Sequence, residues 1–271
     1  MAIELLGAAD APANVALSQR VGWKDAMGDW HTLHAAARVL GVREQGQLIA
    51  QGALGDYGAA ASLAKMVVAP EFQGRGLGRR LLEELLAPAR ERGIPVGLCA
   101  TDQGRPLYEK AGFLASGELM ILFGTPRSAL SMPESVESLV DAATAIELEQ
   151  RFVACDRSRM LRARLGQANA AFCVTGSEPG FVMASPFEAG SVVGPLFASS
   201  DATARRLLEA VFSRVPGAVR IDVPMQHTAL RTWLVELGLH EHSLRVEMVS
   251  GAARTPWQVR ERFALATQAW G

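Results

Sequence analysis

Residues 68–78 read Val-Ala-Pro-Glu-Phe-Gln-Gly-Arg-Gly-Leu-Gly, with three alternate glycines at Gly74, Gly76 and Gly78. The apolar run before this stretch predicts a buried strand, and the apolar positions after it recur at helical spacing. The glycines therefore stand between a strand end and a helix start, where backbone without Cβ atoms can turn sharply. Consecutive N–H groups at such a place can converge on one anion. We therefore expect a local phosphate-binding loop here.

Two other phosphate-binding loops differ from this stretch in their spacing. The dinucleotide motif Gly-x-Gly-x-x-Gly needs its third glycine at Arg79 if it is counted from Gly74, and at Leu81 if it is counted from Gly76. Its ribose-binding acid would correspond to Asp102, after the next strand. The lysine-containing loop also fails, because no Gly-Lys-Ser or Gly-Lys-Thr follows. A plain tight turn remains the alternative, although three alternate glycines are more than a turn needs.

The elements around the loop predict the α/β class. Polar residues 44–47 separate two short apolar runs and indicate a β-hairpin, so antiparallel strands open the fold. Gly93 stands where a helix C-cap glycine belongs. The expected strands are 3–6, 39–43, 48–54, 62–68, 96–100 and 118–123, and the expected helices are about 10–20, 29–40, 78–92 and 106–111.

The same order of elements recurs in the second half, where strands are expected at 191–193, 220–223 and 244–249. A nearly constant offset between matching positions indicates an internal duplication. Residues 125–138 contain two prolines and four serines and predict an exposed connection. We therefore expect domains at 1–125 and 141–271, joined by a linker at 126–140. The matching positions, 125 or 126 residues apart, are Pro70 and Pro195, Leu81 and Leu207, and Gly112 and Gly238.

Composition excludes several classes of protein. The 27 basic and 28 acidic residues nearly cancel, so no overall field would attract nucleic acid or a membrane surface. Cys99, Cys155 and Cys173 are too few and too scattered for a disulfide framework or a metal site. The first residues lack the pattern of a signal peptide, and no apolar run is long enough to span a bilayer. We expect a cytoplasmic protein without a bound metal.

The stretch 68–78 resembles the acyl-CoA loop of the GNAT superfamily of N-acetyltransferases. Residues 107–113, Leu-Tyr-Glu-Lys-Ala-Gly-Phe, resemble a later helix of that family, whose tyrosine donates to the departing thiolate. The resemblance covers about residues 1–125, and the whole chain is similar to tandem proteins with a degenerate second GNAT domain. It implies two mostly antiparallel twisted sheets flanked by helices. This sequence departs from the family at Thr101, where asparagine is common seven residues before the tyrosine.

The resemblance also implies acetyl-CoA as co-substrate, with direct attack of an amine on the thioester in a ternary complex. Tyr108 would be the acid or hydrogen-bond donor, and its alternative role is that of a core aromatic. A backbone N–H from strand end 66–68 would stabilise the oxyanion. The residues expected to bind the cofactor are Met66, Val67, Val68, Gln73, Gly74, Arg75, Gly76, Leu77, Gly78 and Arg79.

The acceptor side is less specified by the sequence. No residue stands out as the general base, and Lys65 occupies the strand before the loop in place of a carboxylate. Trp23, Asp56 and Tyr57 are expected to line the acceptor pocket. The base remains open among a water held by Asp56, Tyr57 or the backbone, and the side chains Asp102 and His31.

The second half lacks the chemistry of the first. The offset aligns the glycine loop with residues 199–204, which contain no glycine, and aligns Tyr108 with Leu234. We expect this half to bind no cofactor and to be structural or to form a wall of the acceptor site. Its tail would pack on a domain or mediate oligomerisation. The expected activity is N-acetylation of a small-molecule amine; the alternatives are a protein N-terminal or lysine acetyltransferase and a non-catalytic acyl-CoA-binding regulator.

Overall fold

The computed structural model describes residues 1–127, 130–188 and 190–270. The first half contains β1 (Ile3–Leu5), α1 (Ala11–Arg20), α2 (Met27–Ala36), β2 (Arg38–Glu44), β3 (Gln47–Asp56), β4 (Ala61–Val68), α3 (Leu77–Glu91), β5 (Val96–Ala100), α4 (Arg105–Lys110) and β6 (Leu114–Gly124). The second half contains β7 (Glu137–Ser138), α5 (Ala142–Gln150), α6 (Ser158–Leu165), β8 (Ala170–Val174), β9 (Gly180–Phe187), β10 (Gly190–Ala198), α7 (Asp201–Arg214), β11 (Val219–Pro224), α8 (Thr228–Glu236), β12 (Leu239–Ser250) and β13 (Arg262–Ala264). Apart from β13 and short 3-10 turns, the two halves repeat one order of elements, which confirms the tandem α/β arrangement.

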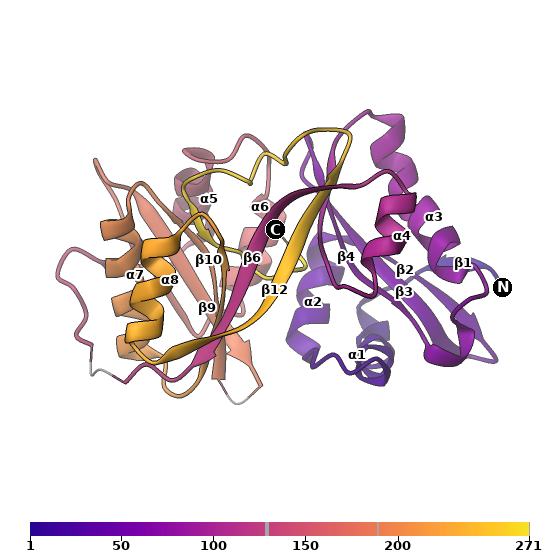
Figure 1. Ribbon diagram of the computed structural model, residues 1–271, viewed down its shortest axis with the longest axis horizontal. Helices are drawn as coiled ribbons and strands as arrows, with labels where there is room; N and C mark the ends of the chain where they lie inside the picture. The colour runs from indigo at the N-terminus through magenta and orange to yellow at the C-terminus, as the bar shows by residue number, and fades with distance from the viewer. Residues whose placement is uncertain (128–129, 189, 271) are drawn as a thin grey trace.

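The described strands form one continuous sheet in the order β1-β2-β3-β4-β5-β12-β6-β11-β10-β9-β8-β7, with β13 paired to β10. The last strands of the two halves are exchanged. β12 pairs with β5 of the first half, whereas β6 pairs with β11 of the second. β6 and β12 also pair with each other and cross the middle of the molecule side by side (Figure 1). Each half therefore completes its sheet with a strand from the other.

Helices cover both faces of the sheet in the first half. Gln51 of β3 accepts a hydrogen bond from Asn14 of α1 and donates one to Ser18, both at 2.9 Å, so its side chain faces α1. A Cβ on the next residue, Gly52, would lie 2.7 Å from Leu85 of α3. Because successive strand residues point to opposite faces, α1 and α3 lie on opposite faces of the sheet.

β4 and β5 form a parallel pair that separates soon after it begins. The two strands pair only at Ala61 with Val96 and at Ser62 with Gly97. From Leu63 onward no register pair joins them, so the sheet opens at this point. The gap lies at the carboxyl ends of two parallel strands, a place where α/β sheets commonly bind ligands.

The equivalent gap in the second half is filled by the chain itself. β10 and β11 are also parallel and also pair over only a few residues. β13 pairs with β10 through Ala264 opposite Leu196, and the Leu265 N–H donates to the Asp222 carbonyl of β11 at 3.1 Å. The tail therefore fills the gap between β10 and β11, whereas the equivalent gap between β4 and β5 in the first half stays open.

The residues after β13 return to the first half. Trp270 is 2% exposed, and the Tyr57 hydroxyl donates to the Trp270 carbonyl at 3.2 Å. Ser62 of β4 likewise donates to the Ala269 carbonyl at 3.3 Å. The tail thus packs on the fold, one of the two roles that the sequence left open. Among the helices that the structure describes, none has the length and apolar character needed to cross a membrane.

One helix boundary differs from the sequence-based expectation. α2 ends at Ala36 rather than near residue 40, because Arg38 to Glu44 pair with β3 as strand β2. Asp29 lies in the first turn of α2. Its carboxylate accepts a hydrogen bond from the Ala26 N–H at 3.0 Å, so it still satisfies a backbone donor at the helix start.

Candidate active site

The glycine loop leads from β4 directly into the N-terminus of α3. Gly74 and Gly76 have φ angles of +74° and +77°, in the left-handed region that favours glycine. A Cβ at either position would meet no atom within 4 Å, so both glycines border open space. Gly76 is the N-cap of α3 and offers no side chain, which leaves the first helical N–H groups without a capping partner. The loop therefore presents backbone donors and the positive end of a helix dipole to an anion.

Side-chain contacts hold the loop in this shape. Gln73 donates from its amide to the Val68 carbonyl at 3.0 Å, which ties the loop back to the end of β4. Arg75 donates to the Glu71 carbonyl at 3.0 Å and lies 4.9 Å from the centre of the Phe72 ring. These bonds fix the backbone before any ligand is present, which lowers the cost of ordering it on binding.

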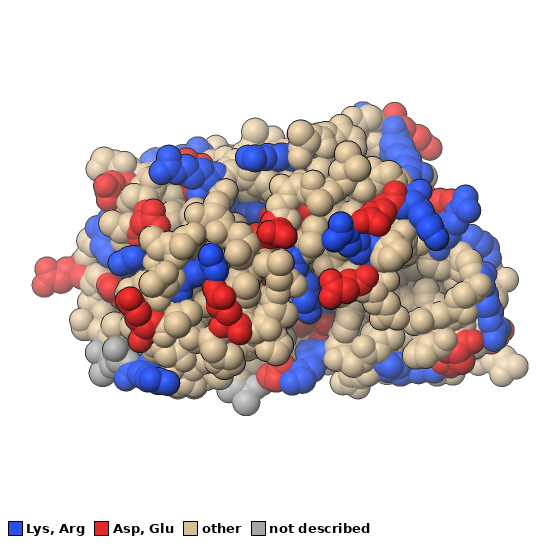
Figure 2. Space-filling view, in the orientation of Figure 1, with Lys and Arg blue, Asp and Glu red and all other residues tan. Residues whose placement is uncertain are grey.

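Positive charge surrounds the loop. Arg79 is 78% exposed and pairs with Glu83 one turn along α3, and Arg80 donates to the Met1 carbonyl. Arg20, the last residue of α1, pairs with Glu71 at the start of the loop. Lys and Arg side chains gather along the right-hand edge of Figure 2, the end of the molecule that carries α3. Although the chain is nearly neutral, this local field favours a polyanion.

A β-bulge in β4 lies beside the gap. Gln51 pairs with Val67 and Ala53 pairs with Ala64, so Lys65 and Met66 together oppose the single residue Gly52. Lys65 has a φ of +54°, the backbone signature of this distortion. A bulge removes backbone groups from the ladder and redirects them. The bulge therefore interrupts the regular β3–β4 ladder at residues 65–66, beside the gap between β4 and β5.

Tyr108 lies on α4 at the other side of the gap. It is 8% exposed, and its ring packs edge-on against Phe113 at 6.0 Å between centroids. Gly104 permits this position, because a Cβ there would lie 3.2 Å from the Tyr108 ring. Burial raises the pKa of the Tyr108 phenol above its ordinary value near 10, and the neighbouring Cys99 adds to the rise. The phenol therefore stays protonated at neutral pH and can donate a hydrogen bond.

A cavity of about 360 Å³ opens from the gap toward the layer of α1 and α2. Ligand pockets for small molecules typically have volumes of about 300 to 1,000 Å³. Both halves of the chain line the cavity. The first half contributes Trp23, Asp25, Lys65, Met66 and Tyr108, among others. The second half contributes Phe187, Arg220, His242, Arg245 and Trp270, among others.

A buried ion pair stands in this cavity. Lys65 donates to Asp25 Oδ1 at 2.5 Å, and the two side chains are 15% and 8% exposed. Asp25 Oδ2 is buried without a hydrogen-bond partner among the described residues. The Lys65 ammonium also lies 5.8 Å from the centre of the Trp23 ring. One carboxylate oxygen is therefore available to a cationic ligand such as an ammonium group.

Several other candidates from the sequence lie elsewhere. Asp56 pairs with Arg92 on the surface, and Tyr57 is buried beneath the tail. Asp102 and His31 are exposed. None of these four candidates is among the residues that line the cavity. Of the three residues expected at the acceptor pocket, Trp23 lines the cavity, together with Met66 from the cofactor set and Tyr108.

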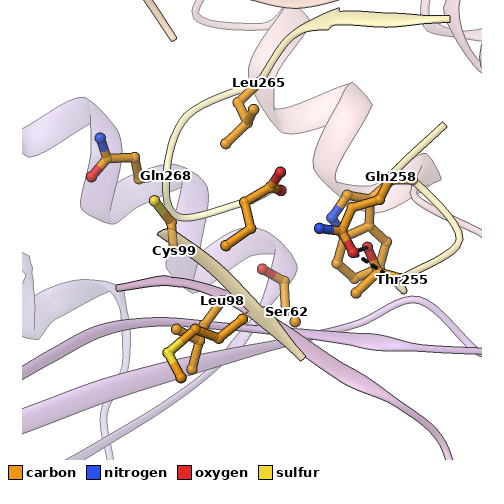
Figure 3. A pocket seen from close by; sticks show the side chains of 11 residues that line it. Ser62, Leu98, Cys99, Thr255, Gln258, Leu265 and Gln268 are labelled. Carbon is orange, nitrogen blue, oxygen red and sulfur yellow. Dashed lines mark hydrogen bonds between the residues drawn. The ribbon is translucent and has the colours of Figure 1, made fainter. Parts of the chain in front are cut away.

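A second, much smaller cavity adjoins the first. Its volume is about 10 Å³, which is near the minimum for one water molecule. Figure 3 shows the polar side chains of Ser62, Thr255 and Gln258 around it, with Cys99 and Gln268 nearby. Cys99 and Gln268 also line the large cavity, so the two spaces are neighbours beneath the tail.

In the second half, the equivalent helix α7 begins without such a glycine loop. The N-cap of α7 is Ser200, whose hydroxyl accepts a hydrogen bond from the Thr203 N–H at 3.2 Å. Asp201 is the first helical residue and places a negative charge where a pyrophosphate would lie. The Ser200 side chain thus already accepts a hydrogen bond from a backbone N–H at the start of α7, where an anion would otherwise bind.

The sequence did not predict the cavity residues that lie far from the glycine loop along the chain. Asp25 lies in a loop between two helices, and Arg220 and Arg245 lie on strands of the second half. Each is an isolated charge without a local motif. Arg245 could be assigned to the site only if it were known that β12 pairs with β5.

Comparisons with known proteins agree with this arrangement. A family model described as "Acetyltransferase (GNAT) domain" matches residues 35–114, and another with the same description matches residues 145–264. The chain is 28% identical over 228 residues to the uncharacterized N-acetyltransferase YitH of Bacillus subtilis strain 168, covering 79% of this chain and 78% of that protein.

Solved structures show the same fold. A putative acetyltransferase from Pyrococcus horikoshii superposes with a TM-score of 0.82 at 19% identity, over 100% of this chain and 95% of that one. A tandem GNAT protein from the clavulanic acid biosynthesis pathway gives a TM-score of 0.64 at 14% identity, over 92% and 98% of the two chains. The chain therefore belongs to the GNAT acetyltransferase family and carries two GNAT domains in tandem.

Proposed function

We propose that this protein transfers the acetyl group of acetyl-CoA to the amine of a small molecule, by direct attack in a ternary complex. One observation carries the proposal: the glycine loop follows the end of β4 at the open gap between β4 and β5, and Met66 of β4 and Tyr108 line the cavity beside that gap. The loop and the cavity lie toward opposite faces of the sheet. Two substrates can therefore approach the gap from opposite sides and meet there.

The first half would hold acetyl-CoA along this path. The N–H groups after Gly76 and the residues Gln73 to Arg79 would bind the pyrophosphate, and Arg79 would add charge. The strand end Met66 to Val68 would pair with the pantetheine arm, as an extended ligand adds to an open strand edge. A backbone N–H at the bulge would then face the thioester carbonyl. We propose that the second half binds no acetyl-CoA, because β13 fills its gap and Ser200 caps its helix.

The reaction removes two protons from the substrate nitrogen. The ammonium loses the first, the neutral amine then attacks the carbonyl carbon to form the C–N bond, and the C–S bond breaks to release the thiolate. The second proton leaves the nitrogen after the C–N bond has formed and passes to solvent, from which the thiolate can take it up. The bulge N–H would stabilise the negative oxygen of the tetrahedral intermediate, an effect worth about 3 kcal/mol for a well-placed donor. Since burial raises the pKa of Tyr108, full proton transfer to a thiolate is uphill by more than about 2 kcal/mol. Tyr108 would therefore act as a hydrogen-bond donor to the departing sulfur.

Asp25 is our candidate for the group that receives the proton of the substrate ammonium. Asp25 lines the cavity and its buried Oδ2 has no hydrogen-bond partner among the described residues, whereas Asp56 and Asp102 do not line the cavity. The Lys65 pair would hold the carboxylate in a fixed orientation. Asp25 would first bind the ammonium and then accept its proton, and the neutral amine would attack the thioester.

Replacing Asp25 with asparagine is expected to lower kcat/KM for the amine about 100-fold at pH 7. Affinity for acetyl-CoA should be unchanged, because Asp25 is not on the cofactor path. The deficit should shrink as the pH rises, since more of the amine is then already deprotonated. Initial rates from pH 6.5 to 10 measure this effect.

The matched control is Asp56→Asn, which removes an exposed carboxylate that does not line the cavity. It should change kcat/KM less than about twofold. An Asp25→Asn enzyme with wild-type rates at pH 7 would remove Asp25 from the mechanism.

Turnover separates this function from its alternatives. The protein, acetyl-CoA and a panel of small amines are incubated, and free CoA thiol and acetylated product are both measured. A protein acetyltransferase would leave the small amines unchanged and acetylate peptides with a free N-terminus or lysine. A regulator would bind acetyl-CoA and release no thiol with any acceptor, and that result would overturn the proposed activity.

A further inference from the structure

We propose that the acceptor amine also carries a carboxylate, and that Arg245 binds this carboxylate from the wall of the cavity contributed by the second half. The inference rests on the proposed acetyl transfer and names the class of its acceptor. It predicts a small amino acid or a related amino-carboxylate.

The charges that line the cavity single out one cation. Four Lys and Arg residues line it, and three of them have a carboxylate partner in the described structure. Lys24 pairs with Glu188, Lys65 pairs with Asp25, and Arg220 pairs with Asp222. Arg245 has no ion-pair partner in the part of the chain that the structure describes. Among the four cationic side chains that line the cavity, Arg245 is therefore the one whose charge is available to a ligand.

Among the described residues, one edge of the Arg245 guanidinium has no hydrogen-bond acceptor. Nη1 donates to the Leu244 carbonyl at 2.8 Å. Nε is buried and has no hydrogen-bond partner among the described residues. The edge formed by Nε and Nη2 offers two parallel N–H donors, the arrangement that matches a carboxylate in a bidentate pair. A buried unpaired donor is costly, and a ligand carboxylate would remove that cost.

Carboxylates of the protein near this part of the sheet are already engaged. Glu247 lies two residues along β12, and both of its oxygens accept hydrogen bonds from Arg262, at 2.9 and 2.7 Å. Asp222 of β11 accepts two bonds from Arg220 and a third from Gln268. Neither is free to turn toward Arg245 without breaking a buried pair. The protein itself therefore does not neutralise Arg245.

The position of Arg245 suits the acceptor rather than the cofactor pyrophosphate. Its neighbour Val246 pairs with Ala100 at the end of β5, so Arg245 stands at the mouth of the gap. The glycine loop lies beyond the end of β4, next to α3. Arg220, the other arginine that lines the cavity, is paired with Asp222, and its guanidinium lies 5.7 Å from the centre of the Phe123 ring and 5.5 Å from that of Phe187. With Asp25 also in the cavity, the lining offers an anion for the amine and a cation for the carboxylate.

The test compares acceptors that differ only in charge. Wild-type enzyme is assayed with α-amino acids and ω-amino acids, each beside its carboxamide, by release of CoA thiol. The inference predicts that the amino acids are better acceptors than their amides by about 10- to 100-fold in kcat/KM. The length of the best ω-amino acid would report the distance from the acetyl group to Arg245.

Arg245→Met should raise KM for the best amino acid about 10- to 100-fold and change kcat little, because the bond is present before and during the reaction. It should leave KM for the matching amide unchanged. Arg245→Lys keeps the positive charge but cannot form the bidentate pair, so its KM should lie between those of wild type and Arg245→Met. Arg254→Met is the matched control, since Arg254 is exposed and does not line the cavity. Thermal unfolding checks that each variant folds.

Three results would overturn the inference in distinguishable ways. If amides and amino acids react equally well, the acceptor needs no carboxylate, but the proposed acetyl transfer stands. If amino acids are preferred and Arg245→Met behaves like Arg254→Met, Arg245 is not the receptor. If no amine of any charge releases thiol, the proposed acetyl transfer to small amines fails, and the inference fails with it.

Discussion

Replacing Tyr108 with phenylalanine is expected to lower kcat about 100-fold, while the dissociation constant for acetyl-CoA stays within about twofold of wild type. The change removes one hydroxyl and keeps the ring that packs on Phe113. Only the hydrogen bond to the developing thiolate is lost. Steady-state rates and calorimetric affinity measure the two effects separately.

The pH profile adds a second readout for Tyr108. Because burial raises the pKa of this phenol, the donating, protonated form persists above pH 10. Wild-type kcat should therefore show no alkaline loss from Tyr108 below pH 10.

Tyr57→Phe is a control of the same chemistry, since Tyr57 and Tyr108 are the two tyrosines of the chain. Tyr57 does not line the cavity, and its hydroxyl bonds to the Trp270 carbonyl. Its loss should reduce the free energy of unfolding by about 1 kcal/mol and leave kcat nearly unchanged. Equal kcat values for Tyr108→Phe and wild type would remove Tyr108 from the mechanism and restore its reading as a core aromatic.

Replacing Gly76 with glutamate is expected to weaken acetyl-CoA binding about 100-fold or more. The side chain would place a negative charge and new bulk beside the N–H groups that are proposed to bind the pyrophosphate. A Cβ at Gly76 meets nothing within 4 Å, so the fold itself can accept the side chain. The left-handed backbone adds a stability cost of about 1 kcal/mol. Calorimetry on the folded variant measures the loss of affinity.

Gly93→Glu matches this change at the other end of the same helix. Gly93 also has a left-handed φ, +64°, and also has no atom within 4 Å of a built Cβ. It should lose a similar amount of stability and bind acetyl-CoA like wild type. If both glutamate variants bind normally, the loop is only a turn. If both lose binding equally, the effect belongs to folding and the loop assignment is not supported.

Local chemistry explains what could be predicted from the sequence. The three glycines between a strand and a helix, the amphipathic pattern of α3 and the hairpin at residues 44–47 all act through neighbours along the chain. The duplication could also be predicted, because the offset between matching residues of the two halves is nearly constant and can be read directly from the sequence. Helices α5 and α6 and strands β8 and β9 were not predicted, because their apolar residues are short runs without strong end signals.

Long-range pairing explains what could not be predicted. β6 and β12 have equivalent places in the repeat, so nothing local states which of them pairs with β5. The sequence also does not reveal that β13 fills the gap between β10 and β11. Because the acceptor cavity is built on this exchange, Arg245 and Arg220 could not be placed in it from their own surroundings.

Calorimetric titration of the wild-type chain with acetyl-CoA tests the central claim most directly. The account predicts binding with a stoichiometry of one per chain, because the first half has an open gap and an uncapped glycine loop while the second half has neither. Two equivalents per chain would show that β13 does not close the second site. No binding at all would contradict the assignment of the loop and, with it, the proposed activity.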